Sequence, residues 1–443
     1  MEEAARKITG GGDPRATATA QLAAVLERRQ PLDQALAGNR AVARLEPRDR
    51  AFVRLLVATV LRRLGQIDDA LTRCLDRPLK ETQPAVLNIL RLGAAQLLFV
   101  GTPPHAAVAT SVALAARGPA AGRRGLINAV LRRLAREGSA ILAGQDAARL
   151  NMPDWLWQGW CATYGETETR AIAATVAGDP PLDLSVASDP ALWADRLGAR
   201  LLPGGTLRLP AGSGDPSQLP GFREGAWWVQ DAAAALPARL LHNALPEPRS
   251  GLRAIDLCAA PGGKTAQLAA AGLSVTALER APARLARLEE NLARLALSAD
   301  CRLGDALTWR PSAPVTAVLL DAPCSATGIL RRHPDIAHIK SRTEVESAAR
   351  EQKKLLAAAA EMVAPGGLLV YAVCSLEPEE GPQRIAECLA GSAAFERLPV
   401  EPAELPGLEN AITPDGEVRT LPSHWAGAGG IDGFYVCRLV RRA

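Results

Sequence analysis

The sequence predicts an α/β protein of the doubly wound, Rossmann-like type, preceded by an all-α part and a small α+β module. Three observations support this prediction. Apolar residues recur at helical spacing in the first third, glycine and proline clusters punctuate the middle, and apolar runs alternate with helical stretches in the last half. Such alternation is typical of a parallel sheet with crossover helices. We therefore expect domains over residues 1–145, 146–228 and 229–443.

The first domain is predicted to be helical because apolar residues follow the i, i+3, i+4, i+7 spacing of one helix face. The two clearest stripes are Val53, Leu56, Val57 and Val60, and Ile127, Val130, Leu131 and Leu134. Arginines surround the second stripe, and because its apolar residues face a core, the arginines should share an exposed face. An ordinary solvated helix surface has the same pattern. The arginines are Arg117, Arg123, Arg124, Arg132, Arg133 and Arg136.

Bulk properties exclude several classes of protein. The formal net charge of +4 is too small to establish a nucleic-acid partner without its distribution. No run approaches the roughly 18 uncharged apolar residues of a membrane span, and the N-terminus has early acids and no apolar core. The 8 cysteines are scattered and lack CxxC or Cys/His spacing. We therefore expect no membrane segment, no secretory signal and no metal site, in a reduced cytoplasmic protein.

A glycine-rich turn follows the first apolar run of the last domain, Ala254–Leu257. Ligands bind beyond the carboxyl ends of strands in such sheets, and small residues let the backbone approach them. The turn matches neither GxGxxG nor the phosphate-binding GxxxxGK[ST], which disfavours a nucleoside triphosphate. A tight turn without a ligand is the alternative. The residues of the turn are Cys258, Ala259, Ala260, Pro261, Gly262, Gly263 and Lys264.

Acidic residues follow the next three predicted strands. Glu279 could accept hydrogen bonds from ribose hydroxyls, Asp305 could accept one from an adenine amino group, and Asp321 ends the fourth strand. Acids at successive strand ends beside a small-residue turn indicate S-adenosyl-L-methionine, a cofactor without phosphate. For Glu279 alone, a strand-end acid that is only solvated is the alternative.

Two Cys-Ser dipeptides end apolar runs, Cys324 in DAPCSATG and Cys374 in YAVCS. A single cysteine after an apolar run is usually a buried structural thiol. Two such thiols at strand ends of one sheet instead indicate chemistry on an electrophilic carbon. A thiolate that adds to C6 of cytosine makes C5 nucleophilic, and a base must later remove the C5 proton. The pattern therefore predicts methylation of a cytosine in RNA.

Longer motifs around these residues resemble those of a known family. The segments DLCAAPGGKT, LLDAPCSATGILRRHPDI and YAVCSLEPEE are similar to the cofactor turn, proline–cysteine loop and nucleophile strand of RNA cytosine-5 methyltransferases. The similarity is specifically to the RsmB (Sun or Fmu) family of 16S ribosomal RNA methyltransferases. Residues 226–236 resemble the segment before its catalytic core, and residues 44–56 and 125–133 resemble its NusB-like helical RNA-binding domain.

The resemblance implies roles for the motif residues. Cys374 would be the nucleophile that attacks C6, and Cys324 would assist proton removal and product release. Asp321 would lie beside the cofactor and the target base, and Lys264 would support the active site. The basic residues after the cysteine loop would reach RNA phosphates, which position a substrate without reading its sequence. These residues are Arg331, Arg332 and His333.

For the cofactor, the resemblance implies that Cys258–Lys264 hold the methionine part, that Glu279 takes the ribose hydroxyls and that Asp305 lies near the adenine. One departure concerns the middle module, where Leu184–Ala187 replaces the family's Leu-Arg-Val-Asn stretch. This module therefore lacks the Arg and Asn on which the family pattern would base RNA contacts, and the pattern does not establish such contacts here.

The resemblance thus implies a monomeric 16S rRNA (cytosine-C5) methyltransferase that uses S-adenosyl-L-methionine. Its substrate would be 16S rRNA, either naked or within a small-subunit assembly intermediate. Two alternatives stay open from the residues. One is a cytosine-C5 methyltransferase that acts on tRNA, and the other is an antitermination-type RNA-binding factor with a vestigial catalytic half.

Overall fold

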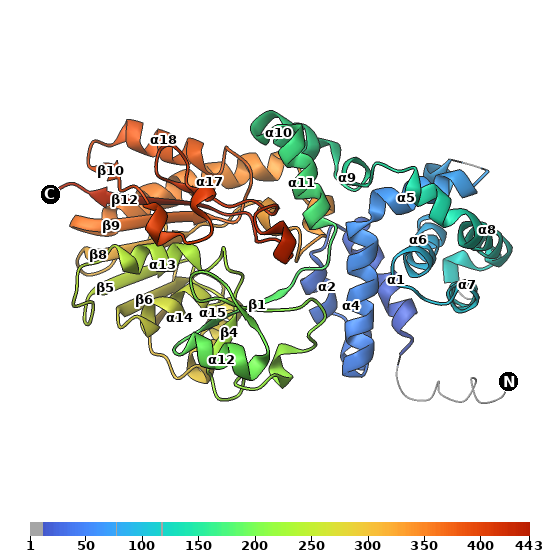
Figure 1. Ribbon diagram of the computed structural model, residues 1–443, viewed down its shortest axis with the longest axis horizontal. Helices are drawn as coiled ribbons and strands as arrows, with labels where there is room; N and C mark the ends of the chain where they lie inside the picture. The colour runs from blue at the N-terminus through green and yellow to red at the C-terminus, as the bar shows by residue number, and fades with distance from the viewer. Residues whose placement is uncertain (1–11, 77, 117) are drawn as a thin grey trace. The chain divides into compact units, whose positions relative to one another are not determined.

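The structure is a computed structural model that describes residues 12–76, 78–116 and 118–443. Arg117 and the N-terminal residues, in which we expect no secretory signal, lie outside the described residues. The chain forms two compact units. The helical unit comprises the chain up to Gly178 together with His333–Lys340, and the sheet unit comprises Asp179–Arg332 and Ser341–Ala443 (Figure 1).

The helical unit is built from amphipathic helices, several of which begin at a proline. Proline suits the first turn because its fixed φ is helical and its missing N–H has no partner to lose there. Both predicted apolar stripes are confirmed, since the first lies buried on α4 and the second lies buried on α8. The helices are α1 (Pro14–Leu26), α2 (Leu32–Ala37), α3 (Arg40–Ala43), α4 (Pro47–Arg62), α5 (Leu64–Cys74), α6 (Pro84–Leu98), α7 (Pro104–Leu114), α8 (Arg124–Ala143), α9 (Ala147–Leu150), α10 (Asp154–Tyr164) and α11 (Glu166–Val176).

Among the described residues, no helix combines the length and the hydropathy needed to cross a lipid bilayer. The helices α9, α10 and α11 belong to the helical unit, so this unit extends beyond the boundary expected near residue 145.

A short segment from the second half of the chain completes the helical unit. Residues His333–Lys340 include the one-turn helix α16 (Ile336–Ile339), whose Ile339 joins the apolar core of this unit. The Asp335 carboxylate accepts a hydrogen bond of 3.0 Å from the Leu32 backbone N–H. The chain thus leaves the sheet unit after Arg332 and returns to it at Ser341.

The sheet unit opens with a small antiparallel sheet in the order β2-β3-β1-β4. A buried ion pair joins two of its strands, with the Arg208 Nε 2.7 Å from the Asp183 Oδ1. The described residues of the expected middle module are therefore divided, because α9, α10 and α11 belong to the helical unit whereas α12 and the strands belong to the sheet unit. The elements are β1 (Leu182–Val186), α12 (Pro190–Leu197), β2 (Arg200–Leu201), β3 (Leu207–Leu209) and β4 (Trp227–Val229).

The large sheet has the order β10-β12-β9-β8-β5-β6-β7, with β11 paired to β12. The pairs from β9 through β8, β5 and β6 to β7 are parallel, which confirms the predicted doubly wound sheet. The strands are β5 (Arg253–Leu257), β6 (Ser274–Glu279), β7 (Asp300–Leu303), β8 (Val315–Asp321), β9 (Val363–Val373), β10 (Phe395–Arg397), β11 (Val418–Arg419) and β12 (Tyr435–Arg441).

Helices cover both faces of this sheet, so its central strands alternate between two apolar cores. On β8, Leu319 packs in the core shared with α13 and α14, whereas Leu320 packs in the core shared with α17 and α18. Figure 1 shows α17 and α18 on the side of the sheet opposite to α13 and α14. The helices are α13 (Leu236–Asn243), α14 (Gly263–Ala270), α15 (Pro282–Arg294), α17 (Arg342–Met362) and α18 (Pro382–Gly391).

The C-terminal strand differs from the prediction. Its β-rich sequence suggests a strand that closes the sheet edge, but β12 lies between β9 and β10 and pairs antiparallel with both. The prediction of an edge was wrong because the short strands β10 and β11, which carry weak sequence signals, pair with β12. The sheet is therefore mixed.

Candidate active site

The predicted site residues meet at one edge of the large sheet. The register places Leu257 of β5 opposite Leu278 of β6 and Leu320 of β8, and Asp321 opposite Ala372 of β9. Parallel strands in register end together, so the segments that follow them converge at their carboxyl ends. The glycine-rich turn and both Cys-Ser dipeptides belong to these segments.

The two predicted thiols lie side by side. The Sγ atoms of Cys324 and Cys374 are 3.4 Å apart, and both side chains are half-buried. Cys374 follows the last residue of β9 directly, and Cys324 lies in the loop after β8. The folded chain therefore brings together two residues that are 50 positions apart in the sequence.

Backbone contacts hold the two cysteine loops against each other. The Gly328 N–H donates a hydrogen bond of 3.0 Å to the Cys374 carbonyl, and the Leu376 N–H donates one of 3.0 Å to the Thr327 hydroxyl. A Cβ at position 328 would lie 1.9 Å from the carbonyl oxygen of Gly433, so only glycine fits this crossing. The separation of the thiols is thus set by two loops that bond to one another.

A buried carboxylate joins the serines that follow the two cysteines. Glu380, whose side chain is fully buried, accepts hydrogen bonds from both the Ser325 and Ser375 hydroxyls. It also accepts bonds from the Ser325 N–H, at 2.8 Å, and from the Gln352 amide, at 3.1 Å. The two serine oxygens are 3.2 Å apart. One side chain therefore contacts both cysteine loops and α17.

The environment of Cys324 favours a protonated thiol. Its hydrogen bond with Cys374, followed by burial, raises the pKa of the Cys324 thiol well above its ordinary value. A thiol held in this way can donate a hydrogen bond to the neighbouring sulfur.

The glycine-rich turn has the strained backbone that its small residues permit. Cys258 has φ of 60° and Gly262 has φ of 101°, both in the left-handed region. Beyond the turn, the Lys264 Nζ lies 2.7 Å from the Asp321 Oδ2. Although burial opposes the charge of Lys264, the Asp321 carboxylate raises its pKa, so the ammonium group is retained. This ion pair links the turn to the end of β8, close in sequence to Cys324.

A small cleft lies at the strand ends, and Asp305 is the strand-end acid that lines it. Cys258, Leu278, Asp305 and Pro323 are among the residues that line it. Asp305 is exposed, and its Oδ1 accepts a hydrogen bond of 2.9 Å from the Leu307 N–H. Glu279 is buried, and its Oε2 accepts no hydrogen bond from the described residues, although an Arg284 nitrogen lies 3.4 Å away. A buried acceptor without a donor is unusual and suits a hydroxyl-bearing ligand.

The expectation that Arg331 reaches RNA phosphates was wrong. Arg331 is 1% exposed and bonds to the carboxylates of Asp231, at 2.8 Å, and Asp432, at 3.1 Å. Arg332 also bonds to Asp432, and His333 lies in the helical unit. The loop was expected to be exposed because it is basic, but acids distant in sequence neutralise the two arginines.

The sequence did not identify Glu380, Ser325 or Ser375 as parts of the site. It also did not identify the ion pairs of Arg331 with Asp231 and Asp432. The repeated Cys-Ser dipeptide was a signal for the serines, since both serines have the same partner. The segment EPEE contains three acids, and nothing in it indicates that the side chain of its last residue, Glu380, is buried against the serines.

Comparison with known proteins gives consistent matches over both units. The family described as 16S rRNA methyltransferase RsmB/F matches residues 244–440, and the NusB family matches residues 13–136. The chain is 35% identical to ribosomal RNA small subunit methyltransferase B of Cronobacter sakazakii, over 90% of this chain and 92% of the relative. It is 36% identical to the protein of the same name from Pseudomonas putida, over 97% and 99%. The crystal structure of PH0851 has a TM-score of 0.70 at 20% identity, covering 97% of this chain and all of that one.

Proposed function

Because the chain belongs to the RsmB/F family of 16S rRNA methyltransferases, we propose that it methylates C5 of a cytosine in 16S rRNA through a covalent adduct with Cys374. Methylation of ribosomal RNA with S-adenosyl-L-methionine as the methyl donor is the activity of the family. The cytosine, its C5 atom and the adduct are our proposal, and the 3.4 Å separation of the two thiols is the observation that carries it.

The residues at the strand ends carry groups that suit the cofactor. The Glu279 Oε2, which accepts no hydrogen bond from the described residues, would accept from ribose hydroxyls, and the exposed Asp305 would accept from an adenine amino group. The apolar wall that includes Leu278 and Pro323 suits a flat ring. The turn Cys258–Lys264 would hold the methionine part. The cofactor would supply an electrophilic methyl group at the edge where the thiols lie.

Cys374 would begin the reaction as a thiolate. Its sulfur forms a bond to C6, and the electron pair of the C5–C6 double bond moves toward C5, which becomes nucleophilic. C5 would then take the methyl group, and the S–CH3 bond of the donor would break to leave neutral S-adenosyl-L-homocysteine. This attack needs access to the face of the ring, so the cytosine must be unpaired or flipped out of its helix. Lys264 and Asp321 would lie beside the ring and balance its charge.

Cys324 would complete the reaction as a base. While the two thiols are free, the bond to Cys374 keeps the pKa of Cys324 high. Formation of the S–C6 bond removes the charge from Cys374, so the main cause of the raised pKa is lost and Cys324 can ionise. Its thiolate then takes the C5 proton, the C5–C6 double bond reforms and the bond from C6 to Cys374 breaks.

The nucleophile is tested by Cys374→Ala. We expect this variant to lose methylation while binding S-adenosyl-L-methionine with nearly unchanged affinity, because the thiol lies outside the cofactor turn. Transfer of a radioactive methyl group to 16S rRNA and calorimetric titration of the cofactor measure the two properties. Methyl transfer by the variant at a wild-type rate would refute the proposal.

Release is tested by Cys324→Ala. We expect a covalent protein–RNA complex to accumulate, because loss of the base slows the last step by about 10²–10⁴-fold. The complex should appear as a slow band on a denaturing gel and should be absent in the variant that lacks both thiols. If Cys324→Ala turns over normally and traps no RNA, another group removes the proton.

We further propose that the protein acts as a monomer in the cytoplasm, on 16S rRNA or a small-subunit assembly intermediate. Bisulfite sequencing of ribosomal and transfer RNA, with and without the gene, tests the substrate. Loss of one 5-methylcytosine from 16S rRNA is expected, whereas loss from tRNA would favour the alternative substrate.

A further inference from the structure

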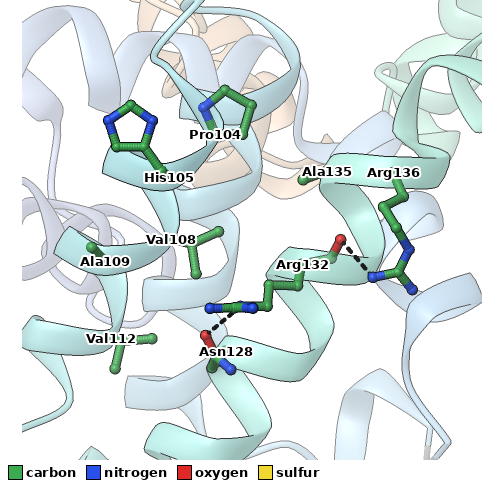
Figure 2. Close-up of a pocket in the computed structure, with 9 residues that line it drawn as sticks. All are labelled: Pro104, His105, Val108, Ala109, Val112, Asn128, Arg132, Ala135 and Arg136. Atoms are coloured by element: carbon green, nitrogen blue, oxygen red, sulfur yellow. Dashed lines mark hydrogen bonds between the residues drawn. The ribbon is translucent and has the colours of Figure 1, made fainter.

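A groove on the helical unit lies between α7 and α8. Its volume is about 660 Å³, and its walls come from these two helices (Figure 2). Val108 and Val112 of α7 form an apolar side, and Arg132 and Arg136 of α8 form a basic side. His105, in the first turn of α7, also lines the groove.

The arginines of this groove are not neutralised as those of the sheet unit are. The Arg132 Nε donates to the neutral amide oxygen of Asn128 at 3.0 Å, and an Arg136 nitrogen donates to the Arg132 carbonyl at 3.3 Å, as Figure 2 shows. The single acid of α8, Glu137, forms an ion pair with Arg133 at 2.9 Å and a longer one with Arg136 at 3.9 Å. Among the described residues, no ion pair is found for Arg132.

We propose that the groove between α7 and α8 binds an unpaired segment of the substrate RNA. This inference rests on the proposed function and places a second RNA contact away from the thiols. Phosphates would meet the two guanidinium groups, and bases would lie against the valines or stack on the arginine planes. RNA is favoured over an acidic protein because the substrate carries one negative charge per nucleotide and the groove has no acidic side chain in its lining.

The double variant Arg132→Gln/Arg136→Gln tests the groove, with Arg28→Gln/Arg40→Gln, two exposed arginines of the same unit outside the motif segments, as a control of equal charge. We expect the groove variant to raise the KM for a 16S rRNA transcript about tenfold or more, with a smaller effect on kcat. The slope of log Kd against log salt should fall by about 1.4, because two phosphate contacts to single-stranded RNA are lost. The control should change both quantities less.

Equal behaviour of the two variants would overturn the inference. So would a groove variant that binds naked RNA normally but methylates small-subunit particles poorly, because that result indicates a protein partner. These outcomes leave the proposed function intact, since they require a wild-type protein that methylates RNA. Absence of any methylation by the wild type would instead refute the proposed function.

A different observation supports a positioning residue. Glu380 is the one described side chain that hydrogen-bonds to both serines next to the thiols, and no ion pair with a cation is found for it among the described residues. Its remaining donors are the Ser325 N–H and Gln352, which also donates to the Pro323 carbonyl at 3.0 Å. The bonds to this carboxylate therefore hold the loop that contains Ser325 against the loop that contains Ser375.

We infer that Glu380 sets the separation of the two thiols by holding both Cys-Ser loops. It does not touch the reacting atoms and acts through Ser325 and Ser375. A glutamine at this position cannot accept from both hydroxyls and the Ser325 amide with the same geometry, because one of its two terminal atoms is a donor. The loops should then separate, and a displacement of about 1 Å can lower a rate on the order of 10²-fold.

The test compares Glu380→Gln with Glu379→Gln, the adjacent acid, whose side chain is partly exposed. An arsenical that bridges two neighbouring thiols reports their separation in the protein without RNA. We expect Glu380→Gln to weaken arsenical binding and to lower kcat without raising the KM for the cofactor, and the control to do neither. If Glu380→Gln fails to fold, Ser375→Ala removes one of the same bonds and should weaken arsenical binding less.

Wild-type arsenical affinity in a folded Glu380→Gln or Ser375→Ala variant would overturn this inference. The arsenical assay needs no methylation, so its result is separate from the fate of the proposed function. A wild-type protein that binds the arsenical but never methylates RNA would refute the function and leave the role of Glu380 in the loop geometry standing.

Discussion

The tripeptide Leu-Arg-Arg occurs at residues 61–63, 131–133 and 330–332, and the arginines of the last two, on α8 and after the cysteine loop, have opposite surroundings. Arg331 is buried against two carboxylates, whereas Arg132 is exposed and bonds to a neutral amide. The difference lies in partners that are about 100 residues distant for Arg331 and four residues distant for Arg132. An arginine that forms ion pairs with acids in the core has a structural role, whereas an exposed arginine without such partners can bind a substrate.

The largest expected effect is on stability. Arg331→Met should lower the free energy of unfolding by about 3–5 kcal/mol, because Asp231 and Asp432 would stay buried without one of their cations. Urea unfolding followed by tryptophan fluorescence measures this change. A stable Arg331→Met protein with weakened RNA binding would instead place Arg331 among the phosphate contacts and break the comparison.

Asp256 is a buried acid that has no arginine partner among the described residues, so it should make the free energy of unfolding depend on pH. Burial raises the pKa of Asp256 to about 7, and Thr265 is its hydrogen-bond donor, at 2.6 Å. The folded carboxyl keeps its proton up to about pH 7 while the unfolded one ionises near pH 4, so stability falls as the pH rises through this window.

The fall attributable to Asp256 should be about 2–3 kcal/mol between pH 5 and pH 8. Asp256→Asn cannot ionise, so its unfolding free energy should decline less than that of the wild type over the same range. Urea unfolding at the two pH values measures the difference. Parallel pH profiles would mean that Asp256 is ionised in the folded protein.

The smallest expected effect is on the free energy of unfolding of a variant in the groove between α7 and α8. Arg136→Met should change the free energy of unfolding by less than about 0.5 kcal/mol, since the side chain is exposed. The same urea measurement applies. A loss as large as that of Arg331→Met would show that α8 needs this charge for packing and would remove the distinction between the two regions.

The sheet and the thiols could be predicted because their signals are local. The runs before Asp321 and Cys374 are continuous stretches of apolar residues, which is the pattern of strands buried on both faces. Once these strands are taken as parallel neighbours, their ends must meet, so the proximity of Cys324 and Cys374 follows from strand order. The small residues around Gly262 likewise indicate a turn that approaches a ligand.

The remaining features depend on contacts between distant segments. Glu380 is one of several acids in EPEE, and only the fold shows that it turns inward toward the serines. The burial of Arg331 requires contacts with Asp231, 100 residues before it, and Asp432, 101 residues after it. No local pattern distinguishes such an arginine from an exposed one, which is why the expected phosphate contact was wrong.

The placement of residues 333–340 has a consequence for how the protein is made. Translation delivers the first 178 residues early, but Ile336, Ala337 and Ile339, which are buried in the finished protein, emerge only after β1 through β8 have left the ribosome. Until then the NusB-like half lacks Asp335 to receive the Leu32 amide and lacks Ile339 in its interior. A chain truncated after residue 178 would therefore never form these contacts of the helical unit.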